Sequence, residues 1–418
     1  MTRTDVIELV MNGPNSGVAF APGTVDVDRF AMDAVAFANF RGGVILLGVE
    51  DDGAITGIQR HNLEEWVMDT VFGRYVHPMI LPFFETVQVD AGRRVAVISL
   101  TQGTAKPYVL RLQDREEIYI RVGSTSRKAS REQQARLFAL GGLLHAELLP
   151  VSGTGLADLD LERLHDYLGQ VLKDPEVPLD GDSWVKRLTR LGFMTERPGG
   201  AEVCTIAGIV LFGRRPRWVL RQAGVRWMAF PGSSMDYAAQ DDAILDDALV
   251  GLWRTEDGDR TLERGGLLEA VIERMRPMVS EESGELADGV RRDRHWFYPA
   301  AAMREALINA LAHRDWTRME DVEVVSYSDR LEVKSPGALP NSMTVEKMLA
   351  GQRSPRNPLI VDVLRDYGYV DARGMGVRTK IVPLLVSHNG VAPEFEATDD
   401  ALTVRMFRGA RAATGSSD

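Results

Sequence analysis

Glu305 and Asn309 lie four residues apart in an apolar, helix-forming stretch that runs from Tyr298 to Asp315. At this spacing both side chains project from one face of an α-helix. A carboxylate placed there can orient a water molecule, and the amide oxygen beside it can hold a hard cation such as Mg²⁺. An ordinary amphipathic helix with its polar residues in water gives the same spacing. The pair therefore predicts either a metal-assisted site or a solvated helix face.

A strand-like segment and two glycine-containing loops follow this helix. Val322–Val333 has the composition of a strand, and it leads to the turn that contains Gly337. The order of helix, strand, glycine turn and Gly-x-Gly loop resembles the ATP-binding domain shared by gyrase, a heat-shock chaperone class, histidine kinases and MutL (the GHKL or Bergerat fold). More closely, the words HRDW, DRLEVKSPGALP, RNP and GMG resemble the C-terminal domain of bacterial RecG-like regulators.

This resemblance implies ATP and Mg²⁺ as ligands. Asn309 would bind the metal by way of the nucleotide, and Glu305 would be the catalytic base if the domain hydrolyses ATP. The implied nucleotide-binding residues are Asn309, Ser335, Gly337, Gly374 and Gly376.

Two positions depart from the pattern of the ATPases. Their first glycine turn carries an aspartate that recognises the adenine amino group, and the aligned residue here is Ser335. A serine can accept one hydrogen bond but lacks the charge that strengthens such a contact. Leu339 stands where a second glycine is expected. We therefore expect weak or absent ATPase activity.

Two polar motifs, one at the end of the helix and one further along the chain, each have two interpretations. His313, Arg314 and Asp315, and later Arg356 and Asn357, could form part of a phosphate pocket. Near a helix end, the same residue types satisfy backbone carbonyl groups and the helix dipole. The sequence leaves both interpretations open.

Composition describes an ordinary globular protein. A chain of 418 residues with 44% apolar content is long enough for two or three domains. Its apolar runs are far shorter than the ~20 residues that cross a bilayer, and no signal peptide is evident. The single cysteine, Cys204, excludes an internal disulfide and fits a reducing compartment, where we expect it to fill a strand core. We therefore expect a cytoplasmic protein without membrane contact.

Charge is unevenly distributed along the chain. The net charge of −11 disfavours strong non-specific binding to nucleic acid. Between Thr104 and Arg136, however, eight basic residues outnumber four acidic ones, whereas Asp236–Asp259 is strongly acidic. A local basic face on an acidic protein is typical of selective nucleic-acid binding. A solvated face of mixed charge is the alternative.

The first third of the chain alternates between helix and strand patterns. The words AFANFRGGVILLGVEDDGAITG, KPY and YIRVGSTSRKAS occur in one order. Together they resemble the AlbA-type Schlafen domain over about the first 140 residues. The resemblance implies a fold that binds or cuts nucleic acid, with a glutamate pair and a later aspartate holding a divalent metal in the nuclease members.

The acidic cluster of the nucleases is largely absent. Ala19-Phe20-Ala21 stands at the expected Glu-Phe-Lys word, and Asn15 lies in the segment that would carry the earlier glutamate. Only Asp51 or Asp52 remains, in a predicted hairpin turn where aspartate is common for local reasons. We therefore expect a nucleic-acid binder that does not cleave.

The predicted phosphate contacts cluster in a loop that leaves a strand. Backbone donors and basic side chains can meet an anion together in such a loop. Tyr108 and Tyr119 are candidates either for stacking on a base or for packing in the sheet. The residues expected to contact nucleic acid are Arg121, Ser124, Ser126, Arg127 and Lys128.

These patterns predict a multi-domain α+β protein. We expect an AlbA-like mixed sheet with helices over residues 1–150, a linking subdomain over 151–232, a Bergerat-type α/β sandwich over 233–410 and a tail over 411–418. The linking subdomain has two helical segments and a turn at Gly199-Gly200, so it is either a winged helix or a packing element.

The predicted function is a DNA-binding transcriptional regulator with a degenerate nuclease site and a nucleotide-binding, ATPase-like domain. We expect it to form a homodimer or higher homo-oligomer, because symmetric dimers commonly bind paired half-sites. The alternative is an ATP-dependent conformational switch, or a phage-defence component of the GHKL class. A working nuclease is the weakest hypothesis.

Overall fold

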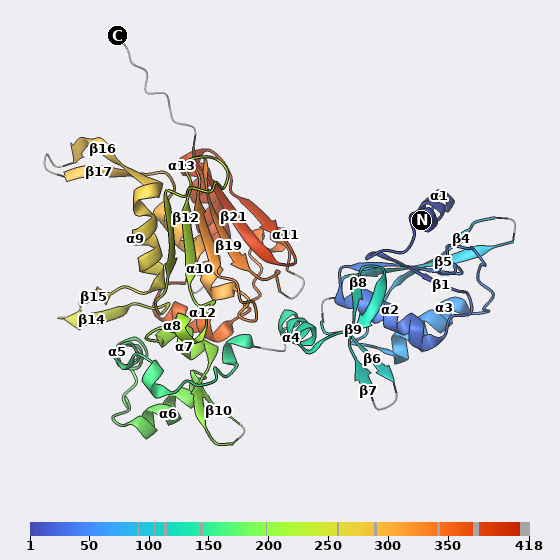
Figure 1. The fold of residues 1–418 in the computed structure, drawn as a ribbon, viewed down its shortest axis with the longest axis horizontal. Coiled ribbons are helices and arrows are strands. Elements are labelled where there is room, and N and C mark those ends of the chain that lie inside the picture. Colours follow the sequence, from blue (N-terminus) through green and yellow to red (C-terminus); the bar gives the residue numbers. More distant parts are fainter. Residues whose placement is uncertain are drawn as a thin grey trace, which may run out of the picture. The chain divides into compact units, whose positions relative to one another are not determined.

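The computed structural model describes residues 1–90, 92–103, 105–112, 115–142, 145–197, 199–256, 259–287, 291–340, 343–370 and 376–409. The chain divides into two compact units, Met1–Leu144 with Pro340–Ser342 and His145–Leu339 with Met343–Asp418 (Figure 1). Helices are mixed with several separate sheets in both, so the predicted multi-domain α+β class is confirmed. Within these described ranges, no helix combines the length and the apolar character needed to span a bilayer.

The first unit is built around a four-stranded mixed sheet between two apolar layers. On one face α1 contributes Val6, and on the other α2 contributes Phe30 and Phe37, all fully buried. The sheet order is β1-β2-β5-β4, with only the β1–β2 pair parallel. The elements are α1 (Arg3–Asn12), β1 (Val18–Ala21), α2 (Val27–Asn39), β2 (Gly42–Leu47), β4 (Phe83–Gln88) and β5 (Arg94–Thr101).

Smaller elements complete the first unit. A three-stranded sheet and a separate hairpin, β8–β9, follow the main sheet, and α4 comes last. Ser130 caps α4 through a reciprocal pair of hydrogen bonds with Gln133, which fixes where that helix begins. The elements are α3 (Leu63–Glu65), η1 (Trp66–Phe72), β3 (Val76–His77), β6 (Val109–Leu112), β7 (Arg115–Glu117), β8 (Tyr119–Val122), β9 (Thr125–Lys128) and α4 (Arg131–Leu140).

The second unit contains a six-stranded sheet with helices packed on one face. The sheet order is β13-β12-β18-β19-β21-β20, in which only β12 and β18 are parallel. Leu307, Leu311 and Val324 are among the buried residues between the helices and the sheet. The elements are β12 (Val225–Ala229), β13 (Asp241–Leu245), α9 (Leu267–Val279), α10 (Ala300–His313), β18 (Val322–Ser326), β19 (Arg330–Pro336), η5 (Val377–Ile381), α13 (Val382–Asn389), β20 (Glu394–Ala397) and β21 (Ala401–Phe407).

The predicted single strand over Val322–Val333 is wrong in one respect. The structure has two antiparallel strands there, β18 and β19, because the chain reverses at Tyr327–Asp329. The backbone of Tyr327 closes this reversal by donating to the carbonyl of Arg330 at 2.8 Å. Three consecutive polar residues, Ser328, Asp329 and Arg330, were the available sign of a turn.

The remaining elements of the second unit pack against the same core. That core is continuous from Ala146 to Met406, so residues 151–232 share their apolar contacts with the sheet and its helices. The elements are η2 (Ala146–Leu148), η3 (Leu156–Asp158), α5 (Leu161–Asp166), η4 (Tyr167–Val171), α6 (Gly181–Arg190), β10 (Met194–Glu196), β11 (Glu202–Cys204), α7 (Ile206–Phe212), α8 (Pro216–Val219), β14 (Leu252–Glu256), β15 (Asp259–Arg264), β16 (Ser280–Ala287), β17 (Arg291–Trp296), α11 (Val345–Leu349) and α12 (Pro358–Asp366).

The sheet face opposite the helices carries a ladder of paired charges. Residues that alternate along each strand point to this face, as in a sheet with one wet side. Arg226 pairs with Asp242 at 2.9 Å, and Lys334 pairs with Glu323 at 3.0 Å. Glu332 receives Arg405 at 3.1 Å. Opposite charges thus meet across the strands, beside a small buried apolar cluster on the same face that contains Met228 and Val325.

Candidate functional sites

The structure brings Glu305 and Asn309 together on α10. The amide nitrogen Nδ2 of Asn309 donates to Oε1 of Glu305 at 3.3 Å. Glu305 is only 4% exposed, and its other oxygen, Oε2, lies 3.5 Å from Nζ of Lys380 but accepts no hydrogen bond from the described residues. A buried carboxylate oxygen without a donor is costly unless a ligand or cation completes it. The carboxylate and amide oxygens of this pair are of the type that Mg²⁺ prefers, while the Lys380 ammonium provides one cation next to Oε2.

Gly376 lies directly against the carboxylate of Glu305. A Cβ atom added to this glycine would come within 1.7 Å of Oε1 of Glu305. An added side chain would therefore have to displace the Glu305 side chain or shift the helix η5 that follows. The sequence placed Gly376 in a phosphate lid, and the structure places it over the catalytic candidate. Gly374, the other predicted lid glycine, lies outside the described residues.

The first glycine turn is tied to the end of α10. Gly337 adopts a φ of +117°, and a Cβ there would come within 2.6 Å of the Cβ of Asp315, so the position requires glycine. Ser335 is buried, and its Oγ donates to the carbonyl of Ala310 at 2.8 Å. Ser335 therefore satisfies a helix carbonyl.

Residues of the HRD and RNP motifs stabilise this turn through hydrogen bonds to backbone carbonyls. Asn357 is fully buried, and its amide donates to the carbonyls of Ala312 and Arg314, each at 2.9 Å. Arg314 in turn donates to the carbonyl of Gln222 at 2.6 Å. These contacts favour the carbonyl-satisfying interpretation over the phosphate pocket for Arg314 and Asn357.

An ion pair continues the same framework. Arg356 lies 3.3 Å from Asp315, with both side chains almost completely buried, and it donates to the carbonyl of Ala338. The backbone of Asp315 donates to the carbonyl of Pro336 at 2.7 Å. The end of α10, the glycine turn and the start of α12 are thereby held as one body. His313 is exposed at the end of the helix.

In the first unit, two of the predicted nucleic-acid contacts point inward. The side chain of Arg121 is 1% exposed; its Nη2 donates to the carbonyl of Asn15 at 2.6 Å, and its Nη1 donates to Oγ of Ser126 at 3.2 Å. Oγ of Ser126 donates to Asp33 at 2.6 Å, and burial raises the pKa of this carboxyl group. Arg121 and Ser126 therefore join the β8–β9 hairpin to α2 and to the segment before β1.

The other predicted contacts are exposed on the same hairpin. Ser124, Arg127 and Lys128 all face solvent. Lys128 pairs with Glu117 at 2.7 Å while remaining 60% exposed, and Nε of Arg127 donates to Oγ1 of Thr125 at 3.3 Å. Exposed ion pairs of this kind are weak, so these cations remain able to contact phosphate.

The two aromatic candidates differ in exposure. Tyr108 is 3% exposed and packs in the core of the first unit, so it is not a stacking platform. Tyr119 is half-buried, and its hydroxyl donates to Glu117 at 2.7 Å. Burial and this carboxylate raise the pKa of Tyr119 to about 12.

The remaining acidic residues near β2 have local partners. Asp51 pairs with Arg29 at 2.6 Å, and Asp52 accepts the backbone N–H of Ala54 at 2.9 Å within the turn. Ala19 and Ala21 lie in the fully buried strand β1. Among the residues that the structure describes, no three His, Cys, Asp or Glu side chains gather where a metal ion could be held.

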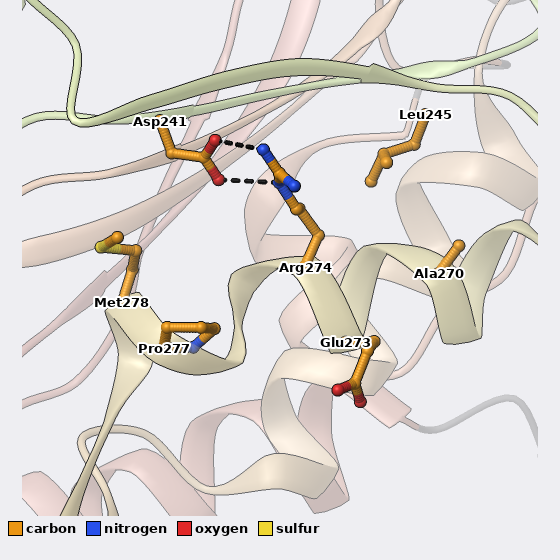
Figure 2. A pocket seen from close by; sticks show the side chains of 7 residues that line it. All are labelled: Asp241, Leu245, Ala270, Glu273, Arg274, Pro277 and Met278. Carbon is orange, nitrogen blue, oxygen red and sulfur yellow. Dashed lines mark hydrogen bonds and ion pairs between the residues drawn. The ribbon is translucent and has the colours of Figure 1, made fainter.

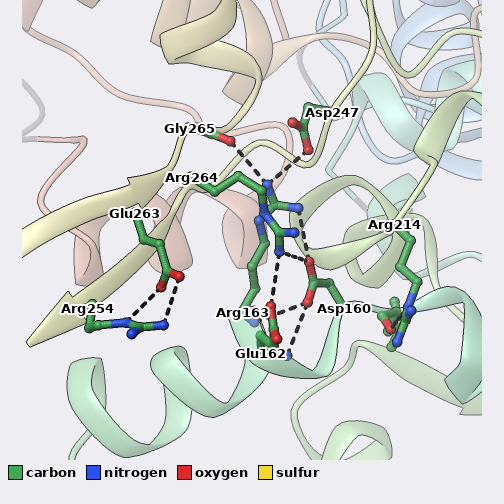
Figure 3. A network of polar contacts seen from close by, with 10 residues as sticks. Asp160, Glu162, Arg163, Arg214, Asp247, Arg254, Glu263, Arg264 and Gly265 are labelled. Atoms are coloured by element: carbon green, nitrogen blue, oxygen red, sulfur yellow. Dashed lines mark hydrogen bonds and ion pairs between the residues drawn. The ribbon is translucent and has the colours of Figure 1, made fainter.

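Two polar clusters of the second unit are visible only in three dimensions. Figure 3 shows Arg163, which is 2% exposed, between Asp160 and Asp247 at 3.4 and 3.0 Å. Arg264 reaches the same Asp160 at 2.6 Å. Glu147 is 1% exposed and accepts the backbone N–H groups of Leu359 and Ile360 at the start of α12. Both clusters link segments about 100 to 200 residues apart, which no local pattern could reveal.

A hollow of about 450 Å³ lies between β13 and α9, well apart in sequence from the predicted sites (Figure 2). Two hydrogen bonds join Arg274 to Asp241 along its wall, and Met278 and Leu245 provide apolar surface. Asp241 also accepts the indole N–H of Trp227 at 2.7 Å. The polar groups of this hollow therefore satisfy one another, and Glu305 and Asn309 are not among its lining residues.

Comparison with known proteins matches two separate parts of the chain. Residues 20–130 match the Schlafen AlbA_2 family, and residues 320–406 match the family described as putative ATP-dependent DNA helicase recG C-terminal. None of the curated proteins compared with the chain matches it.

Two solved structures are similar at low identity. The DIP2311 protein from Corynebacterium diphtheriae is 20% identical, with a TM-score of 0.42 over 94% of this chain and 65% of that one. The chain thus spans just under two thirds of that protein. The N-terminal domain of a putative ATP-dependent DNA helicase RecG-related protein from Nitrosomonas europaea is also 20% identical, with a TM-score of 0.24 over 31% of this chain and 94% of that one.

Proposed function

Because this chain joins a Schlafen AlbA_2 domain to an ATPase-like domain of the RecG C-terminal family, we propose that it is a DNA-binding transcriptional regulator of the bacterial cytoplasm. In this proposal the AlbA-like domain binds DNA without cleaving it. The ATPase-like domain binds nucleotide and Mg²⁺ and hydrolyses ATP weakly or not at all.

The β8–β9 hairpin is the observation that carries the DNA-binding proposal. Arg121 anchors the hairpin from inside the unit, so Ser124, Arg127 and Lys128 are presented from a fixed base. Contacts of this kind go mainly to phosphate and position the protein on the duplex. Preorganised side chains lose less conformational entropy on binding than mobile ones.

A salt series on pooled genomic duplexes tests this proposal. The double variant Arg127→Ala/Lys128→Ala should bind more weakly, and the slope of log K against log salt should fall by about 1.8, or about 0.9 for each lost phosphate contact. Arg74→Ala, which removes an exposed charge outside the hairpin, is the control and should change neither quantity. Enrichment of one sequence motif at physiological salt is expected of a regulator. No retained DNA at low salt would refute the proposal.

The loss of nuclease activity is tested separately. Asp51 and Asp52 are occupied by Arg29 and by the turn backbone, which supports a binding role. Incubation of the wild-type protein with DNA and Mg²⁺ or Mn²⁺ should leave the DNA intact. Cleavage that disappears in Asp51→Ala/Asp52→Ala would overturn this part of the proposal.

A nucleotide-dependent switch is the second candidate, and Oε2 of Glu305 is the observation that favours it. This buried oxygen has no hydrogen-bond partner within the part of the chain that the structure describes, and Asn309 lies beside it. When bound, Mg²⁺ would neutralise the phosphate charge next to Asn309, and Glu305 would orient water. Calorimetry should detect Mg²⁺-dependent nucleotide binding that Asn309→Ala abolishes. Absence of binding to the wild-type chain would eliminate this candidate.

The three-part division at residues 150 and 232 remains part of the proposal. The continuous core from Ala146 to Met406 and the Arg163 cluster support the packing interpretation of residues 151–232. Arg187 of α6 is paired with Asp174, and α6 buries Trp184 and Leu188. We expect Arg190→Ala on its exposed side to leave DNA affinity unchanged. A loss as large as that of the hairpin variant would favour the winged-helix interpretation.

A further inference from the structure

Strand β4 forms one edge of the four-stranded sheet in the first unit. The register of β4 with β5 is regular, and Val89, just beyond the strand, donates to the carbonyl of Arg93 at 3.0 Å. In an antiparallel pair, alternate residues bond to the neighbouring strand. The backbone groups of Phe84, Thr86 and Gln88 therefore face away from β5. None of the described residues forms a hydrogen bond with them.

An apolar stripe leads into this edge. Met79, Leu81 and Phe83 are 67%, 73% and 66% exposed, and their spacing of two places them on one side of the extended chain. Large apolar side chains gathered in this way mark interaction surfaces more often than isolated ones do. The stripe continues directly into the strand whose outer backbone groups are unpaired.

The other edges of the two main sheets lack this combination. Strand β1 is completely buried. Strand β13 carries Asp241 and Asp242, and β20 carries Glu394 and Glu396. Charges on edge strands discourage pairing with another strand. Within β4, by contrast, Glu85 is the only charged residue, and its carboxylate lies 2.7 Å from the amino group of Met1.

We propose that β4 pairs in antiparallel fashion with β4 of a second copy of this chain, about a two-fold axis at Thr86. Such pairing is self-complementary, because the same outward groups supply donors and acceptors on both sides. It joins two four-stranded sheets into one sheet of eight and covers the Met79–Phe83 stripe. On the proposed DNA-binding function, the two β8–β9 hairpins become symmetry mates, and the preferred target is an inverted repeat.

The molar mass of the full chain across a concentration series tests the pairing. The wild-type chain should approach the mass of a dimer. Thr86→Lys places like charges opposite each other at the axis and should give a monomer. Ile244→Lys is the matched control, because Ile244 is also exposed on an edge strand, β13, and this variant should remain dimeric. A monomeric wild type, a dimeric Thr86→Lys or a monomeric Ile244→Lys would overturn the proposal.

Cysteine cross-linking provides a second measurement that does not depend on destabilising a strand. Cys204 is buried and is the chain's single cysteine, so an introduced thiol reacts without competition. Directly opposed residues of a hydrogen-bonded pair lie about 5.5 Å apart at Cα, within disulfide range. Thr86→Cys should therefore cross-link under mild oxidation, whereas Thr261→Cys on exposed β15 should not. Failure of Thr86→Cys to cross-link would exclude this register.

The same samples separate this proposal from the DNA-binding one. A Thr86→Lys monomer that binds a single half-site, but has lost preference for inverted repeats, supports both proposals. A wild-type dimer that binds no DNA leaves the β4 interface intact and refutes the function. A wild-type monomer that binds DNA refutes the β4 interface and leaves the proposed function intact.

Discussion

Both compact units bury a charged side chain at a predicted site, but they satisfy that charge to different degrees. In the first unit, the terminal nitrogens of Arg121 reach two backbone carbonyls and Ser126, and only its Nε has no hydrogen-bond partner among the described residues. The guanidinium lies 4.6 Å from the ring centre of Phe37. In the second unit, Oε2 of Glu305 lies 3.5 Å from Nζ of Lys380 and has no hydrogen-bond partner among the described residues. A charge surrounded by fixed partners holds a fold together, whereas a charge left incomplete is available to a ligand.

The largest expected effect comes from removing the satisfied charge. Arg121→Ala leaves Asp33 buried without its cation, so we expect the first unit to lose about 3–5 kcal/mol of stability. Native-state hydrogen exchange of α2 measures this loss within the full chain. Arg127→Ala, an exposed neighbour, should change stability by less than about 0.5 kcal/mol. Equal protection of α2 in both variants would remove the distinction between the two residues.

The second prediction concerns Glu147, a buried carboxyl group of the second unit that accepts two backbone hydrogen bonds. Burial raises its pKa from the ordinary 4.5 to about 7, against the opposing effect of two backbone donors. The folded state therefore binds a proton more tightly than the unfolded chain, and this contribution to stability falls as pH rises from 4.5 to 7. By linkage the loss is on the order of 3 kcal/mol.

Glu147→Gln should remove that part of the pH dependence. Urea unfolding at pH 5 and pH 7.5 should show a larger drop for the wild type than for the variant. Glu162→Gln, which alters an exposed glutamate of the same unit, is the control and should follow the wild type. Parallel profiles for Glu147→Gln and the wild type would show that the carboxyl group ionises normally.

The third prediction concerns Gly376, which lies against the carboxylate of Glu305. Gly376→Ala would place a Cβ 1.7 Å from Oε1 of Glu305, so the Glu305 side chain and η5, whose Lys380 pairs with it, should shift at a cost of about 1–3 kcal/mol. Exchange of the η5 amides should increase, and any nucleotide affinity should change with it. Gly232→Ala, whose added Cβ meets no atom within 4 Å, should leave both unchanged. Identical η5 exchange in Gly376→Ala and the wild type would contradict the observed contact.

The smallest expected effect on stability comes from neutralising Glu305. Glu305→Gln removes a buried charge that, among the described residues, accepts one hydrogen bond and lies 3.5 Å from Lys380, so stability should change by less than about 1 kcal/mol. Any ATP hydrolysis should disappear while nucleotide binding persists. A destabilisation as large as that of Arg121→Ala would show that Glu305 belongs to the framework.

The sequence predicted what depends on nearby residues. The spacing of Glu305 and Asn309 predicted their common helix face. Two family resemblances, each resting on several motifs in order, were confirmed by the matched regions. These signals are local, so a single sequence contains them in full.

The inward direction of Arg121 could not be predicted in the same way. Its carbonyl partners at Asn15 and Val18 are more than 100 residues distant, and a basic residue beside Arg127 looks equally exposed in the sequence. The contact of Ser335 with Ala310 was equally unpredictable from the sequence, because it depends on how β19 lies against α10. Tertiary packing decided both cases, and Gly374 remains a prediction.

The cap on α12 has a consequence for the order in which the chain folds. Glu147 cannot accept its two backbone hydrogen bonds until Leu359 and Ile360, 212 and 213 residues later in the chain, have been synthesised. At about 5–20 residues per second, that interval lasts roughly 10–40 s on the ribosome. Met1–Leu144, nearly all of the first unit, can fold during this time, whereas the Glu147 side chain stays hydrated until Leu359 and Ile360 emerge. Ribosome-bound chains that end before Leu359 should therefore contain a folded first unit and an unfinished second one.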